Sequence, residues 1–538
     1  MNGAELFVAC LRQQGVEWVS GLCGNGLNSI LAACHAAGVR VIDTRNEQTA
    51  GYMAESWGRL SGQVGVCLAS SGVAHVNAMA GVLNAHFDGA PMLLVTGAGP
   101  LQTAGRGHFQ DLDQVALAAP VCKYARLVDA ADRIPELVHD AFAAAISGRP
   151  GPVHLTIPMD VQTASTSSAP CRRVVRPSGA HPSAEVVRSA VDMLSASRRP
   201  LLVAGSGAFY SGAEEAIEGF CAAYGIPLMV PIWDRGTVVQ PCAEFMGVVG
   251  AATGDPELLE RADLLILAGA ELDYRLAYGR PNAADRPRIM RIEMDAARLA
   301  RGPCDLPILA DPVHAMRELD AAAAARGVSG YEDWLRTAEQ LRNRFTESIR
   351  AGVVRQGDVT HAIDILDAFQ AVLPAEAVLV VDGGNIGQWF HQTLGRRQYP
   401  AHWLTCGASG VVGFGLGGAM AARAGFPSRP VVLLSGDGSA TFTLTDLERA
   451  VGQDLPVVMV VADDQRWGIV ASGQEPSYGQ PLNSILGAID FVAVAEALGA
   501  TGMRVESADQ LAPALQEALA QRRPVLLHVP ISGGIPGA

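Results

Sequence analysis

The chain has 538 residues, of which 49% are hydrophobic and 17% are charged, and its formal net charge is −14 at pH 7. This length is enough for roughly three domains of ordinary size, and the hydrophobic content excludes a disordered chain. The negative charge argues against nucleic acid or an anionic membrane as a main partner, so an anionic cofactor needs local backbone donors and a metal.

The ten cysteines are scattered without a C-x-x-C pair, so they predict neither a zinc site nor a disulfide framework. The first 18 residues carry Glu5 and Arg12 in an amphipathic pattern, unlike the apolar core of a secretory signal. No apolar run approaches the roughly 20 residues that a membrane span needs. We therefore expect a cytoplasmic protein without membrane segments.

Short β-branched runs alternate with Ala-rich stretches of helical length along the whole chain. Strands separated in this way are typical of parallel sheets covered by helices on both faces. The sequence therefore predicts an α/β fold of doubly wound parallel sheets. The runs expected as strands are 64–66, 92–96, 153–157, 201–204, 264–267, 289–292, 378–381, 431–434, 457–461 and 525–529.

Two breaks divide this pattern into three domains. Residues 163–183 are rich in Ser, Pro and Arg without apolar periodicity, as in a linker. The second break lies between Ala351 and Thr360, after a charged helix at 331–350. No internal repeat is visible. The predicted organisation is a domain at 1–162, a linker at 163–183, a domain at 184–330, a connecting helix at 331–355, a domain at 356–530 and a short tail at 531–538.

The first segment with chemical interest is Arg45-Asn46-Glu47-Gln48, which follows a short predicted strand at 39–42. A helix is expected to begin near Glu47. Taken alone, this residue is a first-turn acid of the kind that the helix dipole favours. Its meaning depends on the C-terminal part of the chain.

There, Gly436-Asp437-Gly438-Ser439 stands directly behind the run 431–434, and Asp464 follows the run 457–462. The two carboxylates are expected at the carboxyl ends of parallel strands, where they can ligate a divalent cation that bridges a diphosphate. The glycines allow the backbone to approach the phosphates closely. Asp437 and Asp464 are therefore candidate Mg²⁺ ligands.

Together these segments resemble the thiamine diphosphate-dependent enzymes of the acetolactate synthase, pyruvate oxidase and benzoylformate decarboxylase type. The match rests on residues 45–48, 436–438 and 463–464 in the family's order, and it covers nearly the whole chain. It implies a pyrimidine-binding domain, a middle Rossmann-like domain and a diphosphate- and Mg²⁺-binding domain. It also implies a cofactor held between subunits, with Glu47 of one chain serving Asp437 of its neighbour in a homodimer or homotetramer.

By this resemblance, Glu47 hydrogen-bonds the pyrimidine ring of the cofactor inside an apolar pocket and assists removal of the thiazolium proton. The carbonyl of Gly410 holds the 4′-amine, and Val412 is the apolar wedge that forces the two rings together. The Mg²⁺ ligands are the side chains of Asp437 and Asp464 and the carbonyl of Arg466. Further cofactor contacts are expected from Asn77, Gly383, Gly384, Asn385, Gly436, Gly438, Ser439, Trp467, Gly468 and Ile469.

The substrate pocket is expected in the N-terminal loops. Asn25 resembles the first active-site loop of the family and can donate a hydrogen bond to a substrate carboxylate or oxyanion. Ser70 lies in the next loop, and His108 and Gln110 are the polar groups expected near the reacting carbon. For the neighbouring His75 we expect a packing or hydrogen-bonding role.

The sequence departs from the family at several positions. Asp464 stands where relatives carry Asn, which adds negative charge near a diphosphate. Met159 replaces the Lys of acetolactate synthase, and Gly473 aligns with its Trp, so the substrate pocket should differ in shape. Val412 is smaller than the usual Met or Leu. Met159 and Gly473 weaken the case for standard acetolactate synthesis, whereas Asp464 bears on the affinity for the cofactor.

The implied reaction is decarboxylation of a 2-oxo acid to an enamine, which is then protonated or added to an aldehyde or ketone acceptor. One alternative is an acyl-CoA lyase or decarboxylase of the oxalyl-CoA decarboxylase or 2-hydroxyacyl-CoA lyase type. It is weaker because those relatives extend beyond the last strand. A catalytically silent ligand-binding relative is a remote alternative, against which Glu47 and Asp437 argue.

The middle domain leaves one cofactor question open. Residues 268–275 only partly resemble the flavin-contacting segment of acetolactate synthase, and Gly205-Ser206-Gly207 alone is weak evidence for a nucleotide. We expect a structural domain with a vestigial nucleotide site, and bound FAD is kept as the alternative.

Overall fold

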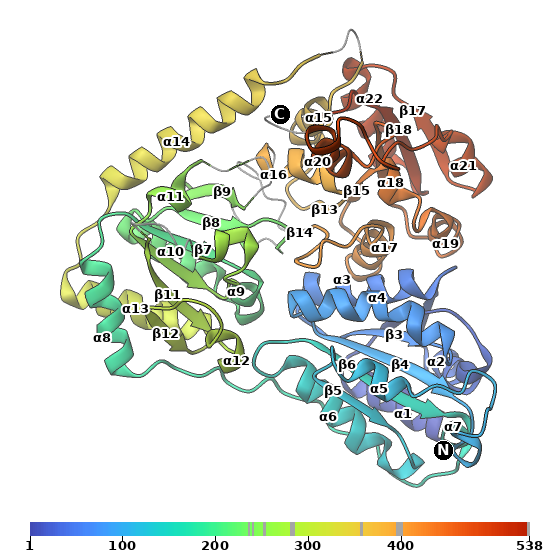
Figure 1. The fold of residues 1–538 in the computed structure, drawn as a ribbon. Helices are drawn as coiled ribbons and strands as arrows, with labels where there is room; N and C mark the ends of the chain where they lie inside the picture. Colours follow the sequence, from blue (N-terminus) through green and yellow to red (C-terminus); the bar gives the residue numbers. More distant parts are fainter. Residues whose placement is uncertain are drawn as a thin grey trace.

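The computed structural model describes residues 1–234, 237–238, 242–250, 254, 256–279, 286–355, 359–393 and 402–534. Within them, three six-stranded parallel sheets covered by helices form three domains (Figure 1). The predicted fold of three doubly wound parallel sheets is thereby confirmed. Residues 356–358 of the third predicted domain and 535–538 of the predicted tail lie outside the described residues.

The N-terminal sheet has the strand order β2-β1-β3-β4-β6-β5. Its central strands are buried at every or nearly every residue, as expected for strands with helices on both faces. The strands are β1 (Trp18–Gly21), β2 (Arg40–Asp43), β3 (Gly65–Ala69), β4 (Met92–Ala98), β5 (Tyr124–Leu127) and β6 (Pro152–Pro158). The helices are α1 (Gly3–Gln13), α2 (Asn28–Ala37), α3 (Glu47–Ser61), α4 (Val73–Asp88), α5 (Gln114–Ala118), α6 (Ile134–Ile146) and α7 (Met159–Thr163).

The middle sheet has the order β12-β11-β10-β7-β8-β9, in which the chain reverses direction beside its first strand. Its strands are β7 (Pro200–Ala204), β8 (Leu228–Pro231), β9 (Phe245–Val249), β10 (Leu264–Ala268), β11 (Arg288–Glu293) and β12 (Leu306–Leu309). Its helices are α8 (Ala184–Ser195), α9 (Ser206–Ser211), α10 (Glu214–Tyr224), α11 (Leu258–Arg261), α12 (Ala296–Leu299) and α13 (Pro312–Arg326). The long helix α14 (Glu332–Ala351) then runs along the outside of the molecule to the last domain (Figure 1).

The C-terminal sheet has the order β14-β13-β15-β16-β18-β17, which repeats the order of the N-terminal sheet strand for strand. No repeat of residues in the two domains accompanies this repeated order. The strands are β13 (Val378–Asp382), β14 (His402–Leu404), β15 (Val431–Gly436), β16 (Val458–Asp463), β17 (Thr501–Arg504) and β18 (Val525–Pro530). The helices are α15 (Ala362–Val372), α16 (Gly384–Gln392), α17 (Gly415–Gly425), α18 (Asp437–Ala440), α19 (Leu447–Gly452), α20 (Gly468–Tyr478), α21 (Phe491–Ala497) and α22 (Ala508–Ala520).

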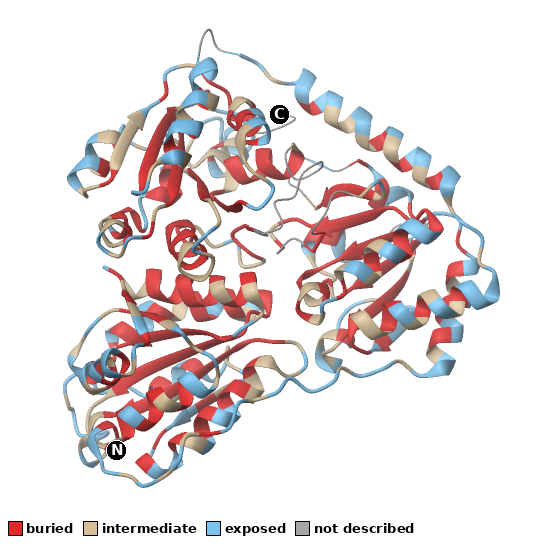
Figure 2. Cartoon of the chain, turned by 180° about the vertical axis from the view of Figure 1, so that it is seen from behind, coloured by how far each residue is buried: buried red, intermediate tan, exposed pale blue. Residues whose placement is uncertain are grey.

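The N-terminal and C-terminal domains share a hydrophobic core where α3 packs on α17. Both helices are mostly buried (Figure 2). Gly417 allows them to approach closely, since a Cβ at this position would lie only 3.0 Å from the Thr49 carbonyl oxygen. Asp446 adds a polar contact, accepting hydrogen bonds from the Arg45 amide and the Thr49 hydroxyl at 2.6 Å each. The start of α3 is therefore fixed against the C-terminal domain.

The described helices include none that is both long and apolar enough to cross a membrane.

Candidate functional site

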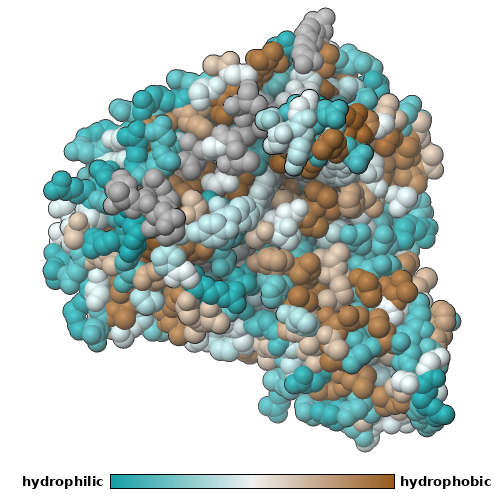
Figure 3. Space-filling model, viewed as in Figure 1, coloured by the Kyte–Doolittle hydropathy of each residue, from teal (hydrophilic) through white to brown (hydrophobic). Residues whose placement is uncertain are grey.

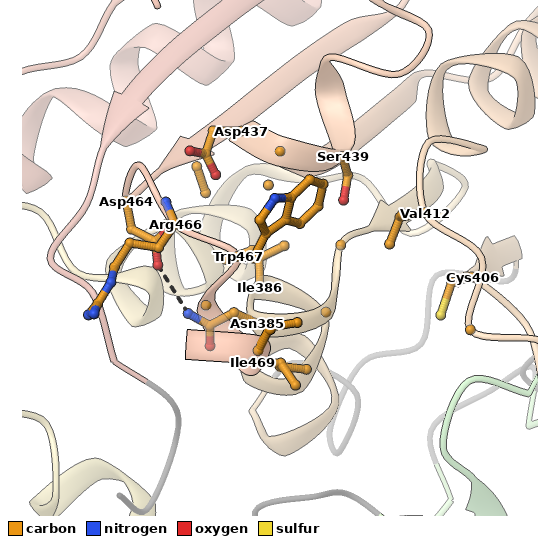
Figure 4. A pocket seen from close by; sticks show the side chains of 18 of the residues that line it. Asn385, Ile386, Cys406, Val412, Asp437, Ser439, Asp464, Arg466, Trp467 and Ile469 are labelled. Atoms are coloured by element: carbon orange, nitrogen blue, oxygen red, sulfur yellow. Dashed lines mark hydrogen bonds between the residues drawn. The ribbon is translucent and has the colours of Figure 1, made fainter. Parts of the chain in front are cut away.

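A pocket of about 280 Å³ opens at the carboxyl edge of the C-terminal sheet (Figure 4). The turns after β13, β15 and β16 meet there, since parallel strands present their carboxyl ends at one edge. Every predicted cofactor residue of this domain lines it, namely Gly383, Gly384, Asn385, Gly410, Val412, Gly436, Asp437, Gly438, Ser439, Asp464, Arg466, Trp467, Gly468 and Ile469.

The glycines of this pocket form a cradle of backbone without side chains. A Cβ on Gly436 would meet no atom of the described residues within 4 Å, so the backbone there faces open space. Gly383 has a φ of +114°, which a residue with a side chain rarely adopts. Trp467 packs on Gly438, where a Cβ would lie 2.7 Å from the indole ring. Amide groups in such a cradle can bind a diphosphate.

Two carboxylates stand beside the cradle. Burial, followed by the charge of Asp464, raises the pKa of Asp437 to about 7. Burial likewise raises the pKa of Asp464. Because both acids are disfavoured in their charged forms, a divalent cation bound between them would relieve the cost.

The side chains of Asn385 and Asp463 lie next to the two carboxylates of Asp437 and Asp464. The Asn385 amide nitrogen donates to Asp464 Oδ2 at 3.4 Å (Figure 4), while its buried Oδ1 has no hydrogen-bond partner among the described residues. The side chain of Asp463 pairs with His528 Nε2 at 2.8 Å and also lies close enough to Asp437 to contribute to the raised pKa of that carboxyl. A buried amide oxygen without a partner, beside two carboxylates and open glycines, fits a bound metal–diphosphate group.

The segment 406–415 forms the pocket's other wall. Gly410 lines the pocket with a φ of +68°, followed by Val412. Asp382, at the end of β13, accepts hydrogen bonds from the amides of Gly413 and Gly415 at 2.8–3.1 Å. Burial raises the pKa of Asp382 to about 7. This side of the segment is therefore anchored to its own domain.

A second pocket, of about 480 Å³, lies at the carboxyl edge of the N-terminal sheet. Glu47 lines it as the first residue of α3, because the Asn46 side chain caps the helix by accepting from the Gln48 amide. The Glu47 carboxylate accepts a hydrogen bond from Asn77 Nδ2 at 3.0 Å and is half-buried in the single chain. The other predicted catalytic residues, Asn25, Ser70, His108 and Gln110, line the same pocket.

Gln110 is held in a strained conformation. Its φ is +56°, which is uncommon for a residue other than glycine, and Ser71 Oγ donates to its side-chain oxygen at 2.9 Å. A Cβ on Gly72 would lie 2.6 Å from Gln110 Cβ, so the glycine permits this packing. The strain is consistent with a side chain aimed for function, although the role of Gln110 stays a prediction.

His75 lies outside the lining of this pocket. Its side chain is fully buried, and its ring centroid is 4.8 Å from that of His154. Burial lowers the pKa of His75 to about 4, so the ring is neutral at ordinary pH. These observations favour the predicted packing role.

The two pockets have no lining residue in common. The single chain thus does not bring Glu47 and Asp437 into one cavity. Four large apolar side chains along one face of α4, those of Val73, Val76, Leu83 and Phe87, are 43–61% exposed. Figure 3 shows hydrophobic patches on the N-terminal and C-terminal domains on the face turned to the viewer.

Several residues that line the two pockets were not predicted from the sequence. Trp233, just after β8 in the middle domain, reaches the C-terminal pocket and packs on Gly387, where a Cβ would lie 2.7 Å from its ring. No motif marked it. Ile386 and Cys406 also line that pocket. Ile386 directly follows the predicted Asn385, and Cys406 lies shortly before the predicted Gly410, which was the available signal. Met159, noted only as a departure, lines the second pocket.

The glycine turn of the middle domain is packed against protein. A Cβ on Gly205 would lie 2.5 Å from the Gly269 carbonyl oxygen, and a Cβ on Gly207 would lie 2.9 Å from Gly269 Cα. These glycines serve the contact between two loops, in contrast to the open Gly436. The FAD alternative gains no support from this turn, and the absorbance spectrum of the purified protein tests it directly.

Comparison with known proteins agrees with this geometry. Family models described as the N-terminal TPP binding, central and C-terminal TPP binding domains of thiamine pyrophosphate enzymes match residues 1–117, 187–319 and 382–529. The acetolactate synthase isozyme 2 large subunit of Escherichia coli is 30% identical, with 99% of this chain and 96% of that protein covered. A probable acetolactate synthase large subunit of Methanocaldococcus jannaschii is 28% identical (99% and 92%), and 2-hydroxyacyl-CoA lyase 2 of Caenorhabditis elegans is 29% identical (96% and 87%).

Proposed function

The chain belongs to the thiamine pyrophosphate enzyme family. We propose that it decarboxylates a 2-oxo acid, and that the remaining fragment is then either protonated or added to a second carbonyl compound. The observation that carries this proposal is the open glycine cradle at Gly436 beside Asp437 and Asp464. The pocket with Glu47 provides the polar groups for the substrate.

The C-terminal pocket would hold the cofactor. The side chains of Asp437 and Asp464 and the Arg466 carbonyl are proposed to ligate Mg²⁺, and the backbone amides around Gly383 and Gly436 to bind the diphosphate. Thiamine diphosphate supplies a nucleophilic carbon and an electron sink for the electrons released with CO₂. The chain's contribution would be orientation: Gly410 would offer its carbonyl to the 4′-amine, and Val412 would be the apolar wedge that forces the two rings together.

Glu47 is proposed to hold a proton on the pyrimidine ring. Asn77 orients the Glu47 carboxylate by donating a hydrogen bond to it. Glu47 lies in the first turn of α3, near the positive end of the helix dipole. In the single chain this carboxylate is only half-buried. The predicted apolar enclosure would therefore come from a partner chain, which would also exclude water from the proton transfer.

We propose a homodimer or homotetramer in which the Glu47 pocket of one chain faces the Asp437 pocket of another. Two observations support it. The two pockets are separate within one chain, and the exposed apolar stripe of α4, formed by Val73, Val76, Leu83 and Phe87, requires cover. Mixing Glu47→Gln chains with Asp437→Ala chains tests this arrangement, because a mixed dimer regains one intact site. Failure of the mixture to exceed either parent in activity contradicts it.

The substrate is proposed to differ from that of standard acetolactate synthesis. Met159 lines the Glu47 pocket where acetolactate synthase carries a cation, and a Cβ on Gly473 would meet nothing within 4 Å among the described residues. Both changes favour a larger, less anionic substrate or acceptor. A second candidate is cleavage of 2-hydroxyacyl-CoA, since the lyase of C. elegans is as similar as the synthases.

The deciding experiment is a panel of 2-oxo acids, with and without aldehyde or ketone acceptors, in which CO₂ release and carboligation products are followed. We expect turnover only with thiamine diphosphate and Mg²⁺ present. A parallel panel of 2-hydroxyacyl-CoA esters, followed by aldehyde release, separates the lyase alternative. Absence of cofactor binding by calorimetry would overturn both.

We also propose a cytoplasmic location. All ten cysteines are free thiols, which suits a reducing compartment. Fractionation of the native cells tests this directly.

A further inference from the structure

A buried polar cluster lies beneath the cofactor-pocket segment that carries Gly410. It consists of Glu55 and Arg59 from α3 and Asn84 and Asp88 from α4, and each of these residues is at most 3% exposed. The cluster lines neither of the two pockets, and the reaction proposed above makes no use of it. Burying two acids and a guanidinium is costly unless they are paired, so the cluster calls for an explanation.

The cluster holds the turn at Gly407–Gly410 by two side-chain hydrogen bonds. The Ala408 amide donates to Asp88 Oδ1 at 2.9 Å, and Ser409 Oγ donates to Asn84 Oδ1 at 2.6 Å. Gly407 has a φ of +82°, and a Cβ there would lie 2.3 Å from Asp88 Oδ2. The turn is therefore fixed to the end of α4 at the two residues directly before Gly410.

Arg59 strengthens this attachment by pairing with Asp88. Its Nε lies 2.9 Å from Asp88 Oδ2, so one carboxylate oxygen faces the guanidinium while the other receives the Ala408 amide. Arg59 also lies over the Phe414 ring at 5.9 Å, at the start of α17. An ionised carboxylate accepts stronger hydrogen bonds than a neutral group, and pairing with the guanidinium offsets the cost of burying the Asp88 carboxylate.

Gly410 is thereby held between two anchors. The N-terminal domain fixes Ala408 and Ser409, and Asp382 of the C-terminal domain fixes Gly413 and Gly415. Between them, a Cβ on Gly410 would meet no atom of the described residues within 4 Å. The Gly410 amide donates to the Gly407 carbonyl at 3.0 Å, so the direction of the Gly410 carbonyl is set by this turn and by its attached neighbours.

We propose that Asn84 and Asp88, supported by Arg59, are positioning residues that set the direction of the Gly410 carbonyl in the cofactor pocket. The inference rests on the proposed function, in which that carbonyl accepts from the cofactor's 4′-amine. It gives the N-terminal domain two tasks: presenting Glu47 in its own pocket, and holding the cofactor turn of its own chain. A shift of about 1 Å in such a group can slow a reaction about 100-fold.

The first test needs no cofactor. Ser409→Ala removes one anchor and leaves the buried charges paired, so the fold should survive, and Ser409→Thr retains the hydroxyl. Hydrogen–deuterium exchange of the peptide 405–415 is measured by mass spectrometry in the full chain. We expect exchange in Ser409→Ala to be about fivefold to tenfold faster, as for one lost hydrogen bond, with Ser409→Thr close to wild type. Equal exchange in all three proteins would overturn the anchoring.

The second test reads the consequence for bound thiamine diphosphate. We expect proton–deuterium exchange at its thiazolium carbon, followed by NMR, to slow at least fivefold in Ser409→Ala and to recover in Ser409→Thr. A faster-exchanging turn with unchanged thiazolium exchange would overturn the positioning role and leave the proposed function standing. A wild-type chain that binds no thiamine diphosphate in calorimetry would overturn the proposed function itself, and the cofactor role of the turn with it.

Discussion

The N-terminal and C-terminal domains share one strand order but offer different chemistry at the same edge of the sheet. After the second strand, the N-terminal domain places the carboxylate of Glu47, and the C-terminal domain places the Gly407–Gly410 turn. At the carboxyl end of the third strand, Gln110 occupies the space beside Gly72 in the N-terminal domain. In the C-terminal domain, the space beside Gly436 is open. One scaffold thus presents side chains in one copy and bare backbone beside the carboxylates of Asp437 and Asp464 in the other.

This difference divides the proposed composite site into a side-chain half, the Glu47 pocket, and a backbone half, the Asp437 pocket. A substitution in the first should change the rate with little effect on cofactor binding. A substitution in the second should change cofactor binding first. The following experiments test that division, from the largest expected effect to the smallest.

Glu47→Gln removes the proposed proton-holding group and keeps its shape. We expect turnover to fall by about 10²–10⁴-fold with the cofactor dissociation constant nearly unchanged. The control is Glu376→Gln, because Glu376 is exposed and lines neither pocket. Turnover is measured by CO₂ release and binding by calorimetry. Full activity in Glu47→Gln would remove the side-chain half from the mechanism.

Asp437→Ala removes a proposed metal ligand in the backbone half. We expect Mg²⁺-dependent binding of thiamine diphosphate to weaken by roughly 100-fold. Asp464→Asn is the informative partner, since an amide oxygen still ligates Mg²⁺ and the neighbouring negative charge is removed. Its affinity should equal or exceed that of the wild type in a calorimetric titration. Unchanged binding in Asp437→Ala would contradict the metal site.

Gly438→Ala tests the cradle itself. The added Cβ would lie 2.7 Å from the Trp467 ring, so the indole must move away from the pocket. We expect cofactor affinity to fall by about tenfold. The matched control is Gly473→Ala in α20, where a Cβ meets nothing within 4 Å among the described residues and the helix should gain about 0.5–1 kcal/mol. Similar affinity in both variants would show that the cradle tolerates side chains.

The smallest expected effect concerns the acid beneath the Gly407–Gly410 turn. Burial, opposed by the charge of Arg59, raises the pKa of Glu55 to about 7. A carboxyl whose pKa is higher in the folded state makes the fold lose stability as the pH rises from about 4.5 through 7. We expect the wild type to lose roughly 1–3 kcal/mol of unfolding free energy over this pH range because of Glu55. Glu55→Gln should remove this loss, which is measured by urea unfolding at several pH values. An identical slope in both proteins would mean that another buried acid dominates.

Much of the fold was predictable because buried strands have a clear signature. Each of the ten runs expected as strands falls on a strand, since a parallel strand covered on both faces is a continuous apolar segment. The strands that were not predicted are short, such as β14, and most lie at sheet edges, where polar residues interrupt the run. The repeated strand order could not be predicted, because two domains can share one order of strands without sharing residues at matching positions.

The site was predictable one half at a time. Each half carries its residues on short segments behind a strand, as in Gly436-Asp437-Gly438, and these segments line a pocket together. The separation of the two pockets and the entry of Trp233 depend on how domains pack, which no local pattern records. The same holds for Asn84 and Ser409, which are 325 residues apart in sequence and joined by one hydrogen bond.

Cys23 gives the Glu47 pocket a built-in chemical reporter. It lines that pocket and is exposed, whereas the other nine cysteines are buried or half-buried. A mild alkylating reagent should therefore label one position in an isolated chain. If assembly covers the pocket, the labelling rate at Cys23 will fall as the protein concentration rises. A single thiol can thus follow the joining of subunits before any substrate is known.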